Sequence, residues 1–173
     1  FMLKKLNQIE PDFIVLINGG ILNKDIIKTA KKGVINAHPG LLPDIRGLDA
    51  VIHSVLRGVP VGLTLHLINE GIDTGDILEK YIIPIKSNDN LEDILLKSDQ
   101  LCNFVLTKFI EGLNKGIEFT TKKQSNKFPL CRKATKEEYK KATNQISEGK
   151  AFSLYLNSKN NKIDAIDCQE YLN

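Results

Sequence analysis

The feature that most constrains the fold is a short apolar strand that ends in two polar side chains. The run from Val34 to His38 is rich in β-forming residues, and Pro39 and Gly40 directly after it stop a strand and begin a loop. Residues two apart in a strand face the same side, so Asn36 and His38 point together. Because open α/β sheets place their sites at the carboxyl ends of apolar strands, this strand end is a candidate site.

The residue types at this strand end suit proton transfer and charge stabilisation. The amide of Asn36 can hold a developing oxyanion, and His38 titrates near neutral pH. Asp73 lies in a glycine-flanked loop, and its carboxylate could orient the imidazole or take the proton of an attacking amine. Taken separately, Asn-x-His and Asp-x-Gly are more often structural, because the second is an ordinary turn signal.

The combination of motifs is more specific than any one of them. In chain order they are Asn36-x-His38-Pro39-x-Leu41-Leu42-Pro43, Arg46-Gly47, Gly62-x-Thr64 and Ile72-Asp73-Thr74-Gly75. This ordered set resembles the formyltransferase family, whose members use 10-formyltetrahydrofolate, and the resemblance is close from about residue 13 to residue 84. It implies that Asn36, His38 and Asp73 form the catalytic triad. Gly40 departs from the family pattern, since many members have Ser or Asn there.

The loop after the first apolar strand has two readings. On the residues alone, Asn18-Gly19-Gly20-Ile21-Leu22 is a plain strand-to-helix turn. The family resemblance implies instead that the loop lines the pocket for the folate pterin. The residues that the resemblance assigns to folate binding are Gly19, Gly20, Ile21, Leu22, Ile68, Asn69, Gly71 and Ile72. The family resemblance implies that the reaction requires no metal ion.

Hydrophobic periodicity predicts the remaining elements. A helix is expected at 2–9, a central strand buried on both faces at 13–17, and a helix from 24 to about 31 that Asn23 caps. The two runs at 61–68 and 77–85 predict an antiparallel pair, with helices at 48–57 and 91–113. His53 and His66 are interpreted as packing residues. Arg46 either pairs with a carboxylate or phosphate or holds its loop through backbone carbonyls.

The C-terminal part carries a weaker pattern. Residues 120–127 are polar and predict a loop, and Thr135-x-x-Glu138 predicts a capping box that opens a helix to about residue 146. Residues 151–156 are β-prone, 159–162 form a turn, and 163–172 are a last strand or helix, which together could make a small hairpin. We therefore divide the chain into a catalytic core at 1–117 and an extension at 118–173.

Composition excludes several classes of protein. The net charge of +3 is too small to indicate nucleic-acid binding. The sequence has neither an apolar run near the roughly 20 residues that span a bilayer nor a signal-peptide pattern, so a cytoplasmic location is expected. The three cysteines, Cys102, Cys131 and Cys168, match no metal-ligand spacing and are expected to be reduced thiols.

The strand at 13–17 arrives almost at once along the chain. Family members have about half of a Rossmann-like unit before this point, including a glycine-rich turn for an acceptor phosphate. We therefore expect either that the chain is a fragment of a longer protein or that a partner chain supplies that half. An uncovered sheet edge favours association, so pairing through this edge is the corresponding hypothesis.

These observations predict an α/β, Rossmann-like fold of formyltransferase type. We expect a mostly parallel sheet with helices on both faces and an antiparallel edge pair. The implied function is transfer of a formyl group from 10-formyltetrahydrofolate to a primary amine, here on a nucleotide-linked amino sugar. Glycinamide ribonucleotide and methionyl-tRNA are alternative acceptors, although the tail is short for a C-terminal β-barrel of the tRNA enzymes. A formyltetrahydrofolate hydrolase and a non-catalytic folate-binding or scaffold fragment also stay open.

Overall fold

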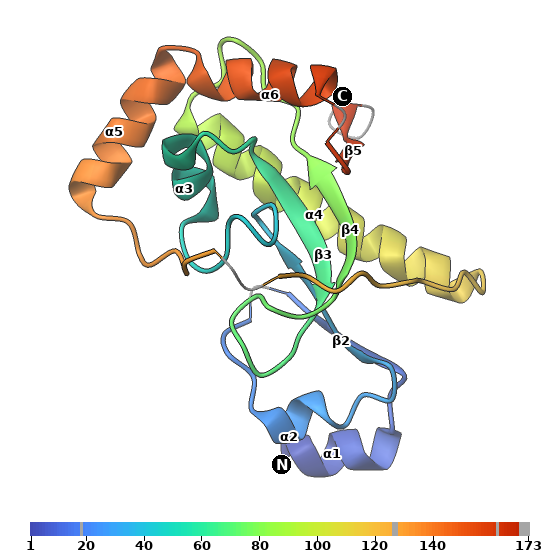
Figure 1. The fold of residues 1–173 in the computed structure, drawn as a ribbon. Coiled ribbons are helices and arrows are strands. Elements are labelled where there is room, and N and C mark those ends of the chain that lie inside the picture. Colours follow the sequence, from blue (N-terminus) through green and yellow to red (C-terminus); the bar gives the residue numbers. More distant parts are fainter. Residues whose placement is uncertain (18, 126–127, 162, 170–173) are drawn as a thin grey trace.

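A mixed β-sheet forms the centre of the molecule (Figure 1). The structure is a computed structural model that describes residues 1–17, 19–125, 128–161 and 163–169. In this part of the chain the strands are β1 (Phe13–Leu16), β2 (Gly33–His38), β3 (Gly62–Leu67), β4 (Ile77–Ile82) and β5 (Ile166–Asp167). The helices are α1 (Met2–Ile9), α2 (Lys24–Ile27), α3 (Ala50–Arg57), α4 (Leu91–Asn114), α5 (Lys136–Ser147) and α6 (Lys150–Asn160).

The sheet order is β1-β2-β3-β4-β5. Strands β1 and β2 pair in parallel, β2 with β3 and β3 with β4 pair antiparallel, and β4 with β5 pairs in parallel. The predicted α/β class, the parallel β1–β2 unit and the antiparallel β3–β4 pair are confirmed. Two expected details are wrong: the described sheet is evenly mixed, and its antiparallel pair lies inside the sheet because β5 adds to β4.

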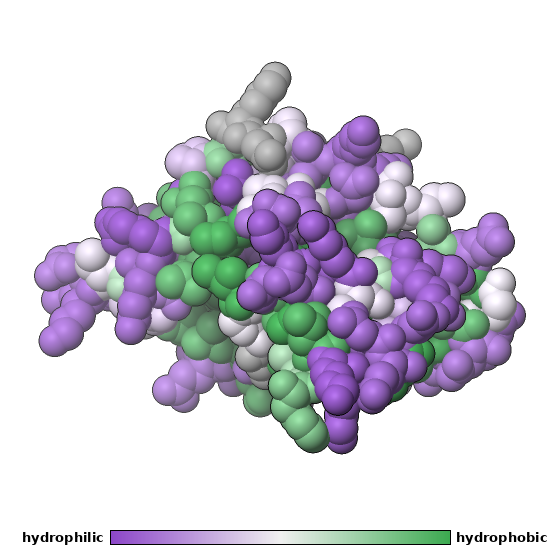
Figure 2. All heavy atoms as spheres, turned by 90° about the horizontal axis from the view of Figure 1, so that it is seen from below, coloured by the Kyte–Doolittle hydropathy of each residue, from purple (hydrophilic) through white to green (hydrophobic). Residues whose placement is uncertain are grey.

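Strand β1 lies at one edge of the described sheet and not at its centre. All four of its residues are half-buried, and Ile17 directly after it is 60% exposed. The expectation of a strand buried on both faces is therefore wrong, because an apolar β-run does not tell how many neighbours cover it. Figure 2 views the molecule from the end that carries α1 and α2, and apolar side chains are exposed there among hydrophilic ones.

Helix α2 is shorter than expected. The side chain of Asn23 accepts a hydrogen bond from the Asp25 amide, so the predicted cap is confirmed. The helix nevertheless ends at Ile27, because the amides of Lys31 and Lys32 bond to the carbonyls of Pro11 and Asp12, at 2.9 and 2.7 Å, and lead the chain into β2.

Helix α4, which was expected at 91–113, covers the sheet. Asn90 and Asp93 form a capping box at its start, which stabilises a helix by about 1 kcal/mol. The helix contacts β2 and β3 and buries an apolar stripe that includes Ile94, Leu101 and Phe109. Burial of each such side chain contributes about 1.5–3 kcal/mol, so the packing of this helix stabilises β2 and β3.

The C-terminal segment forms two helices. The Thr135–Glu138 capping box is confirmed and opens α5. The β-prone run at 151–156 is part of α6, so the expected hairpin is wrong; Ala151, Tyr155 and Ser158 recur at helical spacing and are buried. Strand β5 covers part of the predicted last element, whereas residues 170–172 of that element and residues 126–127 of the predicted loop lie outside the described residues. Among the described helices, none is long and apolar enough to cross a membrane.

Candidate active site

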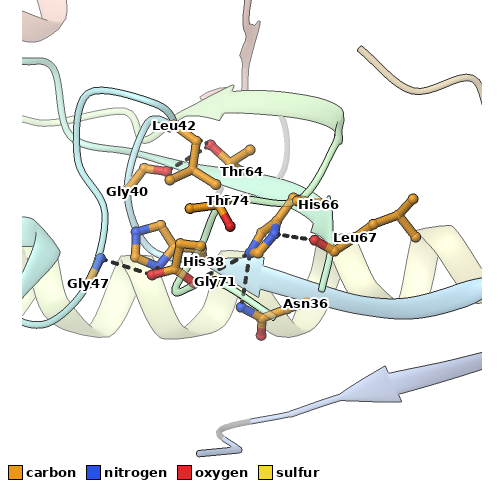
Figure 3. A network of polar contacts seen from close by, with 12 residues as sticks. Asn36, His38, Gly40, Leu42, Gly47, Thr64, His66, Leu67, Gly71 and Thr74 are labelled. Carbon is orange, nitrogen blue, oxygen red and sulfur yellow. Dashed lines mark hydrogen bonds and ion pairs between the residues drawn. The ribbon is translucent and has the colours of Figure 1, made fainter. Parts of the chain in front are cut away.

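Two neighbouring strands bring their polar residues to one place. Residue Asn36 of β2 is paired with His66 of β3, and His38 is paired with Thr64. Directly opposite residues in an antiparallel pair project from the same face. Figure 3 shows the side chains of Asn36, His38 and His66 turned toward one another at this point.

The carboxylate of Asp73 completes the cluster. Its Oδ2 atom lies 3.5 Å from Nδ1 of His38, and its Oδ1 atom lies 3.7 Å from Nε2 of His66. The Nδ2 atom of Asn36 is 3.3 Å from the same Nε2 of His66. The fold thus brings together Asn36, His38 and Asp73, the three residues that the sequence pattern singled out.

Backbone carbonyls define which nitrogen of each ring carries a proton. The Nε2–H of His38 donates to the carbonyl of Ile45 at 2.8 Å, so Nδ1 of the neutral ring carries the lone pair that faces Asp73. The Nδ1–H of His66 donates to the carbonyl of Leu67 at 2.8 Å, and its Nε2 accepts from the Asn36 amide.

Burial keeps both rings neutral. It lowers the pKa of His38 below the ordinary value of 6.5, against the opposing charge of Asp73 and the Ile45 carbonyl. For His66, burial and then the nearby His38 lower the pKa to about 4, although the Leu67 carbonyl and Asp73 act in the opposite direction. At neutral pH the cluster therefore contains two uncharged imidazoles beside one carboxylate.

The loop after β3 presents Asp73 in a sparsely populated backbone conformation. The φ angle of Asp73 is 50°, in the left-handed region. The amide of Gly47 donates to Asp73 Oδ2 at 2.9 Å, and Asn69 accepts bonds from the Gly71 amide and the Thr74 hydroxyl within the loop. These contacts place the carboxylate and leave its side chain 15% exposed.

The turn after β2 leaves no space for a side chain at Gly40. A Cβ atom there would lie 2.7 Å from His38 Nε2 and 2.8 Å from the Ile45 carbonyl oxygen. The Thr64 hydroxyl donates to the Gly40 carbonyl at 2.7 Å and accepts from the Leu42 amide at 3.0 Å. Gly40, which departs from the family pattern, is therefore packed against the ring of His38.

A cavity of about 720 Å³ opens beside this cluster. Asn36, His38 and Asp73 line it, together with every residue that the resemblance assigned to folate: Gly19, Gly20, Ile21, Leu22, Ile68, Asn69, Gly71 and Ile72. The side chains of Ile21 and Ile72 are 86% and 41% exposed. The loops after β1 and β3 thus form one wall of the cavity, with apolar groups at its mouth.

The other wall comes from residues 130–133, which sequence reasoning missed. The Cys131 amide donates to the Arg46 carbonyl at 2.7 Å, and the Cys131 carbonyl accepts from Leu48 at 3.0 Å. Both carboxylate oxygens of Asp49 accept bonds from this side, from the Ala134 amide and the Tyr139 hydroxyl. No local pattern could have indicated this wall, because it depends on contacts between distant parts of the chain.

His66 is a further member of the cluster that the sequence did not reveal. Its place in an apolar strand indicates only a packing residue, and the register of β3 against β2 places it opposite Asn36. His53, in contrast, is buried on α3 and donates from Nε2 to the Arg132 carbonyl at 2.8 Å, which fits the packing role expected for it.

The backbone carbonyl of Arg46 accepts a hydrogen bond from the Cys131 amide, whereas the Nε atom of Arg46 is buried and has no hydrogen-bond partner within the described ranges.

The three cysteines are free thiols, and burial raises the pKa of both Cys102 and Cys168 to about 12. Among the described residues, no group of three or more His, Cys, Asp and Glu side chains is arranged to hold a metal ion.

Comparison with known proteins gives this geometry a context. Residues 2–107 match the formyl transferase family. The chain belongs to this family. The resemblance noted from the ordered motifs is thereby confirmed.

Two curated relatives of the chain are named methionyl-tRNA formyltransferases. A methionyl-tRNA formyltransferase from Thermodesulfovibrio yellowstonii is 34% identical over 154 residues, which are 88% of this chain and 49% of that protein. One from Nitratiruptor sp. is 38% identical over 111 residues, 63% of this chain and 36% of that protein. The chain thus spans about half the length, or less, of these curated relatives.

Solved formyl transferases share the fold. The formyltransferase PseJ from Anoxybacillus kamchatkensis, solved with UDP-4,6-dideoxy-4-formamido-L-AltNAc and tetrahydrofolate, superposes with a TM-score of 0.67 at 26% identity, covering 81% of this chain and 78% of PseJ. A methionyl-tRNA formyltransferase from Clostridium thermocellum superposes with a TM-score of 0.56 at 22% identity, covering 79% and 57%. At that identity the second comparison shows the fold alone. The roles of individual residues in this chain stay predictions.

Proposed function

We propose that this site transfers a formyl group from 10-formyltetrahydrofolate to a primary amine. The observation that carries the proposal is that Asn36, His38 and Asp73 lie together in the lining of one cavity. An amide donor, a neutral imidazole and a carboxylate can together assist acyl transfer to an amine, by stabilising the oxyanion and by moving the proton.

The cavity fits a folate. Its volume of about 720 Å³ lies within the range of small-molecule sites. A Cβ atom on Gly20 would meet no other atom within 4 Å, so a flat ring can approach the backbone there, with Ile21 and Ile72 as apolar neighbours. We propose that Gly19–Leu22 and Ile68–Ile72 hold the pterin. When bound, the folate supplies the formyl group on one of its nitrogens.

In this proposal Asn36 stabilises the oxyanion that forms when the amine attacks. One N–H of its amide is held by His66 Nε2, which fixes the plane of the amide. The second N–H of the same group is then available to the developing charge. His66 acts as the group that orients Asn36, because its own orientation is fixed by the Leu67 carbonyl.

The proton lost by the amine goes to His38 or Asp73. His38 presents an unprotonated Nδ1 toward the carboxylate, and burial keeps that nitrogen available at neutral pH. A proton on Nδ1 would be stabilised at once by Asp73 Oδ2. The pair can therefore accept the proton from the amine and later deliver one to the departing folate nitrogen.

We propose a nucleotide-linked amino sugar as the acceptor. The likeness to PseJ, at 26% identity and a TM-score of 0.67, supports this choice. Methionyl-tRNA is the second candidate, because the curated protein from Thermodesulfovibrio yellowstonii is 34% identical over most of this chain. We also propose that the extension at 118–173 completes the acceptor side, since residues 130–133 line the cavity. The cytoplasmic location stays a prediction from the sequence.

Two acceptors distinguish these candidates. The full chain is incubated with 10-formyltetrahydrofolate and either a UDP-linked 4-amino-4,6-dideoxy sugar or methionyl-tRNA, and formamide product is measured by mass spectrometry. Product from the sugar alone supports the first acceptor, and product from the tRNA alone supports the second. Formate release without any amine would instead indicate a hydrolase. Donor binding with no turnover would indicate a non-catalytic folate-binding chain.

A further inference from the structure

The loop that carries Asp73 is held from outside by the side chain of Gln124. The Nε2 atom of Gln124 donates to the carbonyl oxygen of Asp73 at 3.0 Å and to that of Gly75 at 2.6 Å. Gln124 comes from the segment that follows α4 and runs back across the molecule toward α5 (orange in Figure 1). One side chain therefore ties this distant segment to the loop at two points.

The orientation of the Gln124 amide follows from these partners. Its Oε1 atom is buried and has no hydrogen-bond partner in the part of the chain that the structure describes. The reverse orientation would place Oε1 against two carbonyl oxygens, which are acceptors only. The nitrogen is therefore the atom that faces the loop, and the contact consists of two donated hydrogen bonds.

The loop needs such support because its backbone is strained and tightly packed. Asp73 has a φ angle of 50°, a conformation that costs a residue with a side chain free energy unless its surroundings hold it. At Gly75 the backbone passes so close to Leu67 that a Cβ would lie 1.8 Å from the Leu67 carbonyl oxygen. Bonds to the carbonyls of Asp73 and Gly75 hold the peptide unit between Asp73 and Thr74 and the one between Gly75 and Asp76, and the first of these holds the backbone of Asp73.

The Asp73 carboxylate has close neighbours on several sides, so a small displacement would change its contacts. It accepts from the Gly47 amide at 2.9 Å and lies 3.5 Å from His38 and 3.7 Å from His66. A displacement of about 1 Å at a reacting group can cost about a hundredfold in rate. Gln124 itself is absent from the cavity lining, so it reaches the site only through the loop.

We propose that Gln124 is a positioning residue, which holds the loop at 69–76 so that the Asp73 carboxylate stays between His38 and His66. The expected effect of Gln124 on turnover rests on the proposed function, whereas its effect on the loop can be tested without any assumption about function.

Two substitutions remove the contact in different ways. Gln124→Met keeps the length of the side chain and removes both donated bonds, and Gln124→Glu replaces the donor by an acceptor. The matched control is Gln145→Met on α5, where Gln145 Oε1 accepts from Lys150. Hydrogen–deuterium exchange of the loop amides and nitrogen NMR of the histidine rings are measured on the full chain. The chain has three histidines, and His53, which bonds to Arg132, serves as an internal reference.

Both Gln124 variants should increase amide exchange across 69–76 by about tenfold or more, since two hydrogen bonds to the loop are lost. The ring signals of His38 and His66 should shift while those of His53 stay, and Gln145→Met should match the wild type. Unchanged loop exchange and ring signals in folded Gln124 variants would overturn the proposal. Global unfolding of both variants would also overturn it, because Gln124 would then support the whole chain and not this loop.

Kinetics separate this inference from the proposed function. If the wild type transfers formyl groups, the Gln124 variants should reduce kcat at least tenfold and leave KM for the folate donor within about twofold. A wild type that transfers no formyl group, with the loop response intact, would contradict the function and leave the positioning role standing. A normal kcat in variants with a disturbed loop would contradict the role of Gln124 in turnover.

Discussion

The carboxylate of Asp73 lies 3.5 Å from the Nδ1 atom of His38, the ring nitrogen that carries no proton while Nε2–H is bonded to the Ile45 carbonyl. Two acceptors thus face each other in a largely buried site. This arrangement favours the uptake of one proton between them, because an imidazolium at His38 would gain the attraction of the carboxylate. In the proposed reaction, this pair would receive the proton that the amine loses.

Replacing Asp73 by Asn tests this pairing. The amide has nearly the shape of the carboxylate and tolerates the left-handed backbone, but it carries no charge to stabilise a protonated His38. We expect kcat for formyl transfer to fall by about 10²–10⁴-fold. The control is Asp99→Asn on the exposed face of α4, which should keep the wild-type rate. A rate for Asp73→Asn within threefold of the control would contradict the assignment.

Replacing Asn36 by Ala tests oxyanion stabilisation. The change removes the amide donor and leaves His66 Nε2 without its bond from Asn36. We expect kcat to fall by about a hundredfold or more, with little change in the affinity for 5-formyltetrahydrofolate measured by calorimetry. Asn103→Ala, on the exposed surface of α4, is the control. Loss of folate affinity without loss of kcat would show that Asn36 binds the donor and does not stabilise the oxyanion.

Replacing Gly40 by Ala should disturb His38. The new Cβ would lie 2.7 Å from His38 Nε2, so the ring or the Ile45 carbonyl must move, at a cost of about 1–3 kcal/mol in stability. We expect turnover to fall at least tenfold. Gly149→Ala is the control, because φ at Gly149 is 82° and the change strains the backbone away from the site. Equal activity in the two variants would mean that only stability responds to Gly40.

Acid should weaken the fold through its buried histidines. The unfolded chain takes up protons on His66 below about pH 6.5, whereas the folded chain does so only near its pKa of about 4. The stability contributed by the neutral ring is thus present above pH 6.5 and is lost as the pH falls toward 4, by at most about 3 kcal/mol. Urea unfolding at a series of pH values measures this loss, and His66→Gln should reduce its slope. An identical slope in the variant would contradict the account of His66.

Short sequence patterns were enough to predict features that depend on neighbouring residues alone. The Thr135-x-x-Glu138 pattern predicted the start of α5, and the two-residue repeat of a strand predicted that Asn36 and His38 share a face. The run at 151–156 misled, since its β-prone residues also repeat at helical spacing and pack through Ala151 and Tyr155. Its secondary structure follows from burial, which a short window does not reveal.

The rest of the site depends on contacts between distant parts of the chain. His66 joins the cluster through the β2–β3 register, and Gln124 reaches the Asp73 loop from beyond α4. The cavity wall at 130–133 depends on Asp49, which binds Ala134 and Tyr139. The motifs thus predicted which residues could react, and the tertiary fold determines which residues orient them.

The most direct test of the account is the fate of 10-formyltetrahydrofolate in the presence and absence of an amine. Wild type and Asp73→Asn are each mixed with the donor, with and without the UDP-linked 4-amino sugar or methionyl-tRNA, and tetrahydrofolate and formamide are quantified together. Equal amounts of tetrahydrofolate and formamide are expected, and only in the mixtures that contain both an amine and the wild type. Formate release that needs no amine, or equal turnover by Asp73→Asn, would contradict it.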